Sequence, residues 1–302
     1  MTSLPMHARS FAPFAAVFAL LALPFATAQA QTTAWPLKVV AAENFYGGIA
    51  AQIGGAHVSV SNIIANPDQD PHSFEATPGQ VRQVADAKIV IFNGGHYDEW
   101  MEKLLKAAPR KDRLTVNAAA VVKAKHGGNP HLWYAPATMP AVAKAMAAAF
   151  TKADAAHASD YAANLDKVLA ELERVTQRVG QLREKHKGKP VTATEPVFGL
   201  MAEALGLTMR NEKFQLALMN ESEPSARDIA AFESDLKARK VKVLLYNSQV
   251  SEKLAQRLVD IANQSKVPVV GVTETQPADK SFVDWMLGQL DALDKALDTP
   301  GA

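Results

Sequence analysis

Short runs of consecutive apolar residues alternate along the chain with longer stretches in which apolar residues recur every three to four positions. The runs are rich in β-branched residues and lie at 37–42, 58–64, 88–93 and 114–119, and again at 190–195, 241–247 and 267–273. Continuous apolar runs of this length are typical of strands buried on both faces of a parallel sheet. The pattern therefore predicts an α/β fold with two mostly parallel sheets flanked by helices, one in each half of the chain.

One helical pattern, between the two halves, is much longer than the others. Ser159 is placed to cap its start, and basic residues followed by Gly188 close its end. At 1.5 Å per residue this helix would be roughly 40 Å long, the length of a domain. We therefore predict two lobes with separate cores, at 36–152 and 189–298, joined by one rigid helix at 156–187.

The first thirty residues have a different pattern from the rest of the chain. Arg9 precedes an apolar stretch that Pro24 interrupts, and small residues follow at Ala28 and Ala30. This is the pattern of a secretory signal peptide, residues 1–30, with cleavage near Ala30. The apolar stretch falls short of the about 20 residues that a membrane-spanning helix needs. We therefore expect export without stable membrane insertion.

The composition excludes several classes of protein. With 48% hydrophobic and 21% charged residues among 302, the chain is typical of soluble globular proteins. A formal net charge of +1 gives no basic excess for binding nucleic acid or anionic lipid. The absence of cysteine excludes disulfides, thiolate ligands and a lipid-bearing cysteine behind the signal. We therefore expect a monomer that is free in the periplasm.

Four side chains that can bind a metal ion lie at the ends of predicted strands or in the loops that follow them. His72 in "DPHSFEATP" and His131 in "NPHLWYAP" belong to the first lobe, and Glu195 and Glu274 end two strands of the second lobe. Ligands of open parallel sheets bind beyond the carboxyl ends of the strands, so all four are expected to face one cleft. Two imidazoles and two carboxylates suit a divalent metal ion.

Each of these residues also has an ordinary explanation. A loop histidine is often a hydrogen-bonded surface residue, Glu195 could cap the helix that follows it, and Glu274 could be a solvated acid. The loop of His72 is held at its far end by a predicted capping box of Thr77 and Gln80. The remaining candidates nearby are weaker. Glu43 and Asn247 end strands and face the cleft in this interpretation, whereas His96, Tyr97 and Trp100 are assigned to packing and surface.

The motifs "NPDQDPHSFEATP", "NPHLWYAP", "TEPVFGLMAEALGL" and "VPVVGVTET" occur in an order that resembles the bacterial metal-ion ABC-transporter solute-binding proteins of the zinc and manganese type. The resemblance covers essentially the whole mature chain. It implies two α/β lobes joined by one long helix, with one metal ion bound between them. It places the four ligands on His72, His131, Glu195 and Glu274.

Two positions depart from the family pattern. Ala135 stands where family members usually carry an aspartate that supports the second histidine. The long histidine-rich loop of many zinc-type members is represented only by His126. The absence of that histidine-rich loop and the presence of Glu195 in place of a third histidine both favour manganese over zinc as the bound ion.

We therefore interpret the chain as the periplasmic substrate-binding component of an ABC importer and not as an enzyme. It would capture Mn²⁺ or Zn²⁺ and deliver the ion to a cognate membrane permease and its ATPase. The alternative is a secreted metal-dependent hydrolase that uses the same four residues, although the sequence has no HExxH motif and no clear general base beside them. A sugar or amino-acid receptor would need aromatic platforms, and only 7% of the residues are aromatic.

Overall fold

Two four-stranded parallel sheets form the framework of the computed structural model, which describes residues 1–2, 36–66, 69, 71, 74–220, 222–249 and 253–299. The strand order is β2-β1-β3-β4 in the first sheet and β6-β5-β7-β8 in the second. Every pair of neighbouring strands is parallel, which confirms the predicted fold class. The strands are β1 (Leu37–Glu43), β2 (Val58–Ile64), β3 (Ile89–Phe92), β4 (Leu114–Asn117), β5 (Pro190–Ala193), β6 (Thr208–Arg210), β7 (Leu244–Asn247) and β8 (Val269–Val272).

All seven predicted strands are present, several of them shortened at one end or both. Strand β6 at the edge of the second sheet was not predicted, because its residues Thr208, Met209 and Arg210 form no apolar run. The predicted signal peptide at 1–30 lies almost entirely outside the described residues. Within the described residues, no helix combines the length and the apolar character that crossing a membrane requires.

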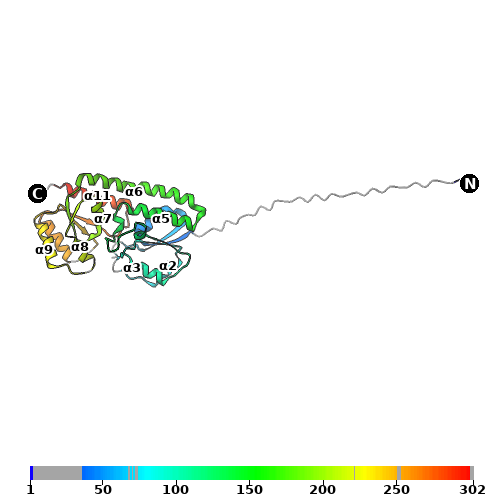
Figure 1. Cartoon of the computed structure of the whole chain (residues 1–302), viewed down its shortest axis with the longest axis horizontal. Helices are drawn as coiled ribbons and strands as arrows, with labels where there is room; N and C mark the ends of the chain where they lie inside the picture. Colours follow the sequence, from blue (N-terminus) through cyan, green and yellow to red (C-terminus); the bar gives the residue numbers. More distant parts are fainter. Residues whose placement is uncertain are drawn as a thin grey trace. The chain divides into compact units, whose positions relative to one another are not determined.

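Helices cover both faces of each sheet (Figure 1). They are α1 (Asn44–Gly54), α2 (Pro78–Asp86), α3 (Glu99–Ala107), α4 (Ala118–Val121), α5 (Thr138–Ala153), α6 (Ala158–His186), α7 (Gly199–Ala204), α8 (Glu212–Met219), α9 (Ala226–Lys237), α10 (Lys253–Gln264) and α11 (Phe282–Asp298), with 3-10 turns η1 (Gly55–His57), η2 (Leu132–Tyr134), η3 (Ala155–His157) and η4 (Pro196–Phe198). The capping box of Thr77 and Gln80 is present at the start of α2, as predicted.

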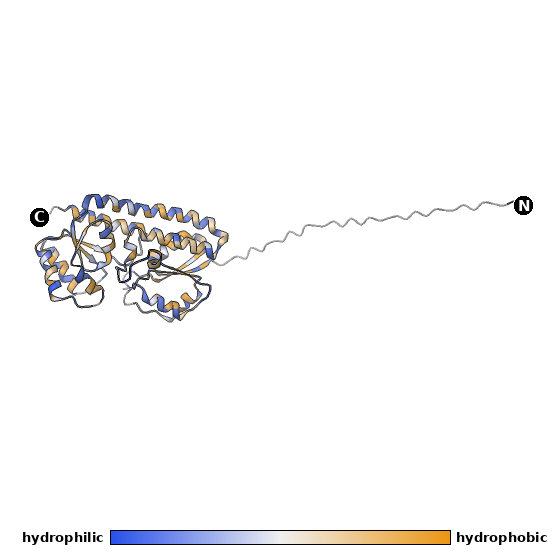
Figure 2. Cartoon of the chain, in the orientation of Figure 1, coloured by the Kyte–Doolittle hydropathy of each residue, from blue (hydrophilic) through white to orange (hydrophobic). Residues whose placement is uncertain are grey.

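Helix α6 connects the two halves of the chain and runs alongside α5 and α11 (Figure 1). Its 29 residues correspond to a length of about 43 Å. Ser159 does not cap it, because the helix already begins at Ala158 and the residue before it, His157, holds the cap position. The predicted end is confirmed, with basic residues in the last turn and Gly188 at a φ of 81°. Figure 2 shows α6 as mainly hydrophilic, with hydrophobic positions repeating along it.

The main hydrophobic core is continuous through both lobes. It includes Ile91 of β3 and Leu245 of β7, together with Val175 of α6 and Leu290 of α11, all of them buried. The expectation of separate cores is therefore wrong. Helices α1, α5 and α11 pack together around α6, so the inner faces of both sheets share one apolar interior. Two smaller clusters lie elsewhere, one around α2 and α3 and one around α8, α9 and α10.

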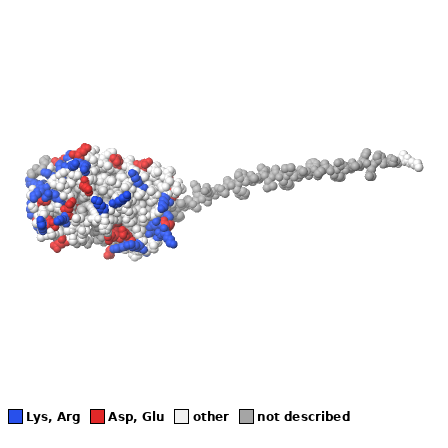
Figure 3. Space-filling model, viewed as in Figure 1, with Lys and Arg blue, Asp and Glu red and all other residues white. Residues whose placement is uncertain are grey.

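On the face drawn in Figure 3, neither acidic nor basic side chains dominate. Acidic and basic side chains are interspersed over the face drawn in Figure 3, in agreement with a formal net charge of +1.

Candidate metal centre

The chain changes direction within each sheet at a point where a ligand site is expected. In the order β2-β1-β3-β4 this point lies between β1 and β3, and in the order β6-β5-β7-β8 it lies between β5 and β7. Glu43 ends β1 and Asn247 ends β7, while Glu195 follows β5 after one intervening residue. Both crevices therefore carry polar groups that the sequence had already singled out.

His131 and Glu274 meet across the two lobes. The Nε2 atom of His131 lies 3.1 Å from Oε1 of Glu274, and the two side chains are only 1% and 7% exposed. The rings of Tyr97 and Trp133 pack edge-on against the imidazole. A nitrogen and a carboxylate oxygen at this distance need a proton between them. A cation can replace that proton, so the pair is suited to bind one.

Asn129 determines which nitrogen of His131 faces Glu274. Its Nδ2 donates to the carbonyl of Pro196 at 2.6 Å, which leaves Oδ1 as the acceptor. This oxygen accepts from the backbone N–H of His131 at 3.0 Å and from its Nδ1 at 2.8 Å. The Nδ1 atom is therefore protonated, and Nε2 is the nitrogen available to a metal ion.

Asn247 brings the two carboxylates of the second lobe together. Its Nδ2 donates to Oε2 of Glu195 at 2.8 Å and lies 3.4 Å from Oε2 of Glu274. Glu195 occupies the cap position of η4, but its side chain makes no capping hydrogen bond. The explanation of Glu195 as a helix cap is therefore excluded. Because the Nδ2 atom of Asn247 donates to both carboxylates, Asn247 holds Glu195 and Glu274 close to each other.

The first lobe contributes a pair of buried acids, Glu43 and Asp98. Burial and the nearby carboxyl of Asp98 raise the pKa of Glu43 well above its ordinary value. Burial also raises the pKa of Asp98 to about 6. Asp98 accepts two backbone N–H bonds, whereas neither oxygen of Glu43 has a hydrogen-bond partner among the described residues. The charge of Glu274 contributes to the raised pKa of Glu43, so the acid pair and the second-lobe carboxylate influence one another.

Three of the four predicted ligands are thus linked by the structure, namely His131, Glu195 and Glu274. The fourth, His72, lies outside the described residues. Sequence reasoning missed Asn129, although an asparagine two positions before a histidine is a known local hydrogen-bonding pattern. It supplies the support for His131 that the alanine at 135 had put in doubt.

Further hydrogen bonds across the cleft hold the lobes in contact. Asn44, the first residue of α1, donates from its side-chain amide to the backbone carbonyl of Gln276 at 2.8 Å. The hydroxyl of Tyr134 donates to the carbonyl of Thr273 at 2.5 Å. These two hydrogen bonds join the lobes directly.

Another group of possible ligands is already neutralised by the chain. Oxygens of Asp294 and Asp298 lie close to His186, but Lys185 pairs with both aspartates and Arg178 pairs with Asp294. These contacts join α6 to α11, and the cations of the chain occupy the position that a metal ion would need. The cluster is a structural ion network.

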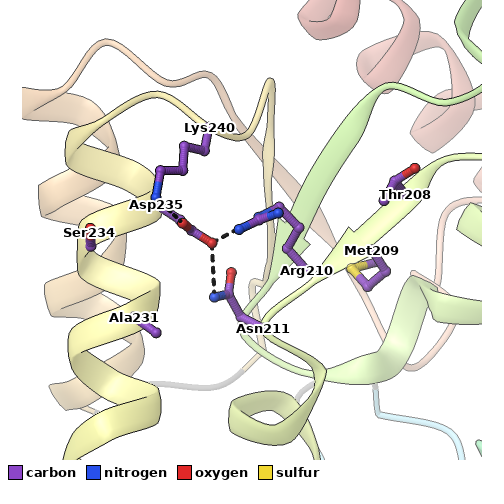
Figure 4. Close-up of a pocket in the computed structure, with 8 residues that line it drawn as sticks. All are labelled: Thr208, Met209, Arg210, Asn211, Ala231, Ser234, Asp235 and Lys240. Atoms are coloured by element: carbon purple, nitrogen blue, oxygen red, sulfur yellow. Dashed lines mark hydrogen bonds and ion pairs between the residues drawn. The ribbon is translucent and has the colours of Figure 1, made fainter.

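A cavity of about 550 Å³ lies between β6 and α9, and the charged side chains that line it pair with one another (Figure 4). Asp235 lies at its centre and accepts from Arg210 Nε at 2.8 Å and from Asn211 at 3.3 Å. Lys240 approaches the same carboxylate at 3.5 Å. Its cations are paired with this acid, so the cavity offers no comparable set of converging ligands.

The comparison with protein families gives one match over most of the chain. The model of the family described as "Zinc-uptake complex component A periplasmic" matches residues 39–296. A "High-affinity zinc uptake system protein" of Bacillus subtilis is 24% identical over 251 residues, which cover 76% of this chain and 77% of that protein. A "Manganese-binding lipoprotein" of the same organism is 24% identical over 239 residues, covering 76% of each.

The fold is shared with solved structures. The periplasmic zinc binding protein TroA of Treponema pallidum superposes with a TM-score of 0.74 at 20% identity, over 87% of this chain and 99% of that chain. A zinc-bound deletion mutant of ZnuA superposes with a TM-score of 0.73 at 20% identity, over 88% of this chain and all of that chain (100%). The two-lobed arrangement with one connecting helix is therefore a known fold.

Proposed function

The chain belongs to the family of periplasmic components of zinc-uptake complexes, and on that premise we propose that it binds one divalent transition metal ion between its lobes. The ligands are His72 and His131 of the first lobe and Glu195 and Glu274 of the second. The ion is cargo, which the protein captures and passes on. The chemistry of the site is therefore binding and release.

The observation that carries this proposal is the contact of His131 Nε2 with Glu274 across the lobes, with Glu195 held beside it by Asn247. Taking a carboxylate out of water is costly unless a positive partner compensates it. A divalent ion at this point would receive imidazole and carboxylate ligands from both lobes. It would also replace the hydrogen bond between His131 and Glu274, because Nε2 cannot bind a proton and a metal ion at the same time.

The donor set admits both Mn²⁺ and Zn²⁺. Two carboxylates that bind through both oxygens, together with two imidazoles, can give the six ligands that manganese prefers. The same four residues binding through one atom each form a tetrahedron that suits zinc, and intrinsic affinity is higher for zinc. We propose manganese as the physiological cargo, because a glutamate stands at the third ligand position, 195, and the histidine-rich loop is absent.

None of the relatives described above is named as a hydrolase, so the comparisons give no support to the alternative of a metal-dependent hydrolase. We propose the location and the partners of an importer component. The protein acts in the periplasm and delivers its ion to a membrane permease driven by an ATPase. A small displacement of one lobe lengthens the bonds to the ligands of the other, which allows release on docking.

The test is metal binding by the purified full chain after chelator treatment. Isothermal titration with Mn²⁺ and with Zn²⁺ should each give one tight ion per chain, and replacing any of the four ligands by alanine should remove it. At one hundred times the dissociation constant, the ion should stabilise the wild type by about 2.7 kcal/mol. His57→Ala is the matched control, because His57 pairs with Asp160 away from the cleft and its loss should leave binding unchanged.

Two outcomes would contradict the proposal. Absence of a tight ion in the wild type would remove the function altogether. Wild-type affinity in Glu274→Ala would show that the ion lies elsewhere. The cargo itself is tested by elemental analysis of protein isolated from its native periplasm without chelators, where zinc in place of manganese would overturn the choice of ion.

A further inference from the structure

The two proposed histidine ligands of the first lobe each follow a proline. His72 follows Pro71, and His131 follows Pro130. The carbonyl carbon of each proline is bonded to the backbone nitrogen of its histidine in a planar peptide unit. A hydrogen bond that holds the carbonyl of the proline therefore also places the backbone of the histidine, from which the imidazole extends.

Asn93 holds the carbonyl of Pro130. Its Nδ2 donates to this carbonyl at 2.9 Å and to the carbonyl of Gly94 at 2.8 Å, and since both partners can only accept, the orientation of the amide is fixed. Its Oδ1 accepts from the hydroxyl of Tyr46 at 2.7 Å. Asn93 follows β3 directly and is 0% exposed. Every polar atom of this buried amide thus has a partner, and one of the partners is the residue before His131.

Trp100 holds the carbonyl of Pro71. Its Nε1 donates to this carbonyl at 3.0 Å, and its ring packs on that of Phe74 with the centroids 4.5 Å apart. Pro71 and Phe74 lie on either side of His72 in the sequence, so the indole contacts the chain before and after this ligand. The sequence assigned Trp100 to packing and surface. In the structure it is buried, and it donates a hydrogen bond to the loop that carries a proposed ligand.

Both contacts come from one short segment, residues 93–100, which connects β3 to the first turn of α3. Asp98 shapes this segment by accepting the backbone N–H groups of Asn93 and Gly94, both at 2.7 Å. Gly94 has a φ of 69°, and a Cβ atom at this position would lie 2.5 Å from Oδ1 of Asn117. The segment is therefore held in one conformation that a larger residue at position 94 would disturb.

We propose that Asn93 and Trp100 are positioning residues for metal binding, which fix the two histidine ligands relative to one another before an ion arrives. This inference rests on the proposed function and extends it, because it makes the first lobe the preformed half of the site. Neither side chain is a ligand, and each acts through the proline that precedes one. Ligands that are already in place lose less freedom on binding, and a site works only when its groups lie within about 0.5 Å of the productive geometry.

The experiment measures the dissociation constant for Mn²⁺, by competition with a chelator, in Asn93→Ala and Trp100→Phe. Alanine removes the amide, whereas phenylalanine keeps an aromatic ring beside Phe74 but has no N–H donor. Each variant should bind Mn²⁺ about 10- to 100-fold more weakly than the wild type, as is typical when a group that supports a ligand is lost. Asn164→Ala is the matched control. Its Nδ2 also donates to a backbone carbonyl, that of Ile53 at 3.2 Å, but this bond joins α6 to α1, and its loss should leave the dissociation constant unchanged.

The spectrum of bound Co²⁺ distinguishes a positioning role from a general loss of stability. The visible absorption of Co²⁺ depends on the number and the geometry of its ligands. When the variants are saturated with Co²⁺ well below their melting temperatures, Asn93→Ala and Trp100→Phe should give bands that differ from those of the wild type in position or intensity. Asn164→Ala should give the wild-type bands. A side chain that only stabilises the fold would lower the melting temperature of the metal-free protein and change neither the spectrum nor the dissociation constant.

A second variant tests the same amide if Asn93→Ala does not fold. Tyr46→Phe removes only the hydroxyl that donates to Oδ1 of Asn93, and it should also weaken Mn²⁺ binding. The inference is refuted, and the proposed function stands, if the wild type binds Mn²⁺ tightly while either Trp100→Phe or the folded variant that perturbs Asn93 binds it within about twofold of the wild type. If the wild type binds no tight ion, the function fails and the inference fails with it.

Discussion

Replacing Asn129 by alanine should weaken metal binding strongly, although Asn129 is not itself a ligand. Its amide links His131 of the first lobe to the carbonyl of Pro196, which is adjacent to Glu195 in the second lobe. The Asn129 side chain thus determines which nitrogen of His131 is protonated, and it fixes the position of His131 relative to Glu195. Alanine removes all three hydrogen bonds that the amide makes.

The size of the effect follows from the bond to Nδ1. When a metal ion binds Nε2, the imidazole becomes polarised, and a hydrogen bond from such a charged group contributes about 1.5–3 kcal/mol. Loss of this kind of support typically lowers metal affinity about 10- to 100-fold, which corresponds to about 1.4–2.7 kcal/mol. The two values agree, so we expect a dissociation constant raised about 10- to 100-fold in Asn129→Ala.

Gly199 allows the same contact to be perturbed from the other lobe. A Cβ atom at position 199 would lie 2.8 Å from Nδ2 of Asn129, so Gly199→Ala must turn the amide away from Pro196. Gly180→Ala in α6 is the matched control, since nothing lies within 4 Å of its added methyl group. Competition titration against a chelator, for the same ion and pH, measures the dissociation constants of all the variants.

The double variant Asn129→Ala/Gly199→Ala decides whether both changes act through one contact. Its affinity should equal that of Asn129→Ala alone, because the second change then has nothing left to displace. The reasoning is refuted if Asn129→Ala binds within about twofold of the wild type, a difference of less than about 0.5 kcal/mol. Additive losses would show instead that Gly199→Ala acts through another part of the structure.

Three further outcomes concern stability of the metal-free protein. Burial and Asp98 raise the pKa of Glu43, so the folded chain holds the proton of this carboxyl more tightly than the unfolded chain does. The stability of the wild type therefore falls as the pH rises above 4.5. Glu43→Gln should melt at a higher temperature than the wild type at pH 8, and the difference in melting temperature should shrink toward pH 5. Burial opposes ionisation of Asp294, but its hydrogen bonds, that of His186 first, lower the pKa of this carboxyl. The ionised carboxylate therefore stabilises the fold above pH 3.8, and this contribution is lost as the pH falls. Asp294→Asn should lower the free energy of unfolding by about 2 kcal/mol at pH 7 in a denaturant titration, and by less at acidic pH. Tyr134→Phe removes a hydroxyl that donates across the cleft and should cost about 1–2 kcal/mol in the same titration, whereas an unchanged midpoint would show that these bonds do not stabilise the fold.

The sheets could be predicted from the sequence because buried parallel strands leave a continuous apolar run. The same signal fails for β6, where three residues at a sheet edge contain a single apolar side chain. The helical pattern of α6 was equally clear, but its first residue was not. In the sequence, a serine in the first turn of a helix looks the same as a serine that caps it, and Ser159 lies in the first turn. Periodicity also gives no information on which apolar faces meet, and so the shared core was missed.

The candidate centre was predictable where side chains follow strands. Glu195 and Glu274 each lie just beyond a strand of the second sheet, whose carboxyl ends gather at one edge, whereas His131 meets them from the loop between α4 and η2 of the first lobe. The partners that orient them were not predictable in the same way. Asn129 acts through a turn and a carbonyl 67 positions away, and such a pairing depends on how the lobes are packed together.

The shared apolar interior around α6 has a consequence for how such proteins can be recombined. Since residues of both lobes complete one core, neither lobe possesses a finished apolar surface of its own. A chimera that takes its first lobe from one family member and its second from another must match side-chain volumes along α1, α5, α6 and α11, and close-packed interiors tolerate little mismatch. Metal preference is therefore more readily exchanged between relatives by grafting the loops after the strands than by swapping whole lobes.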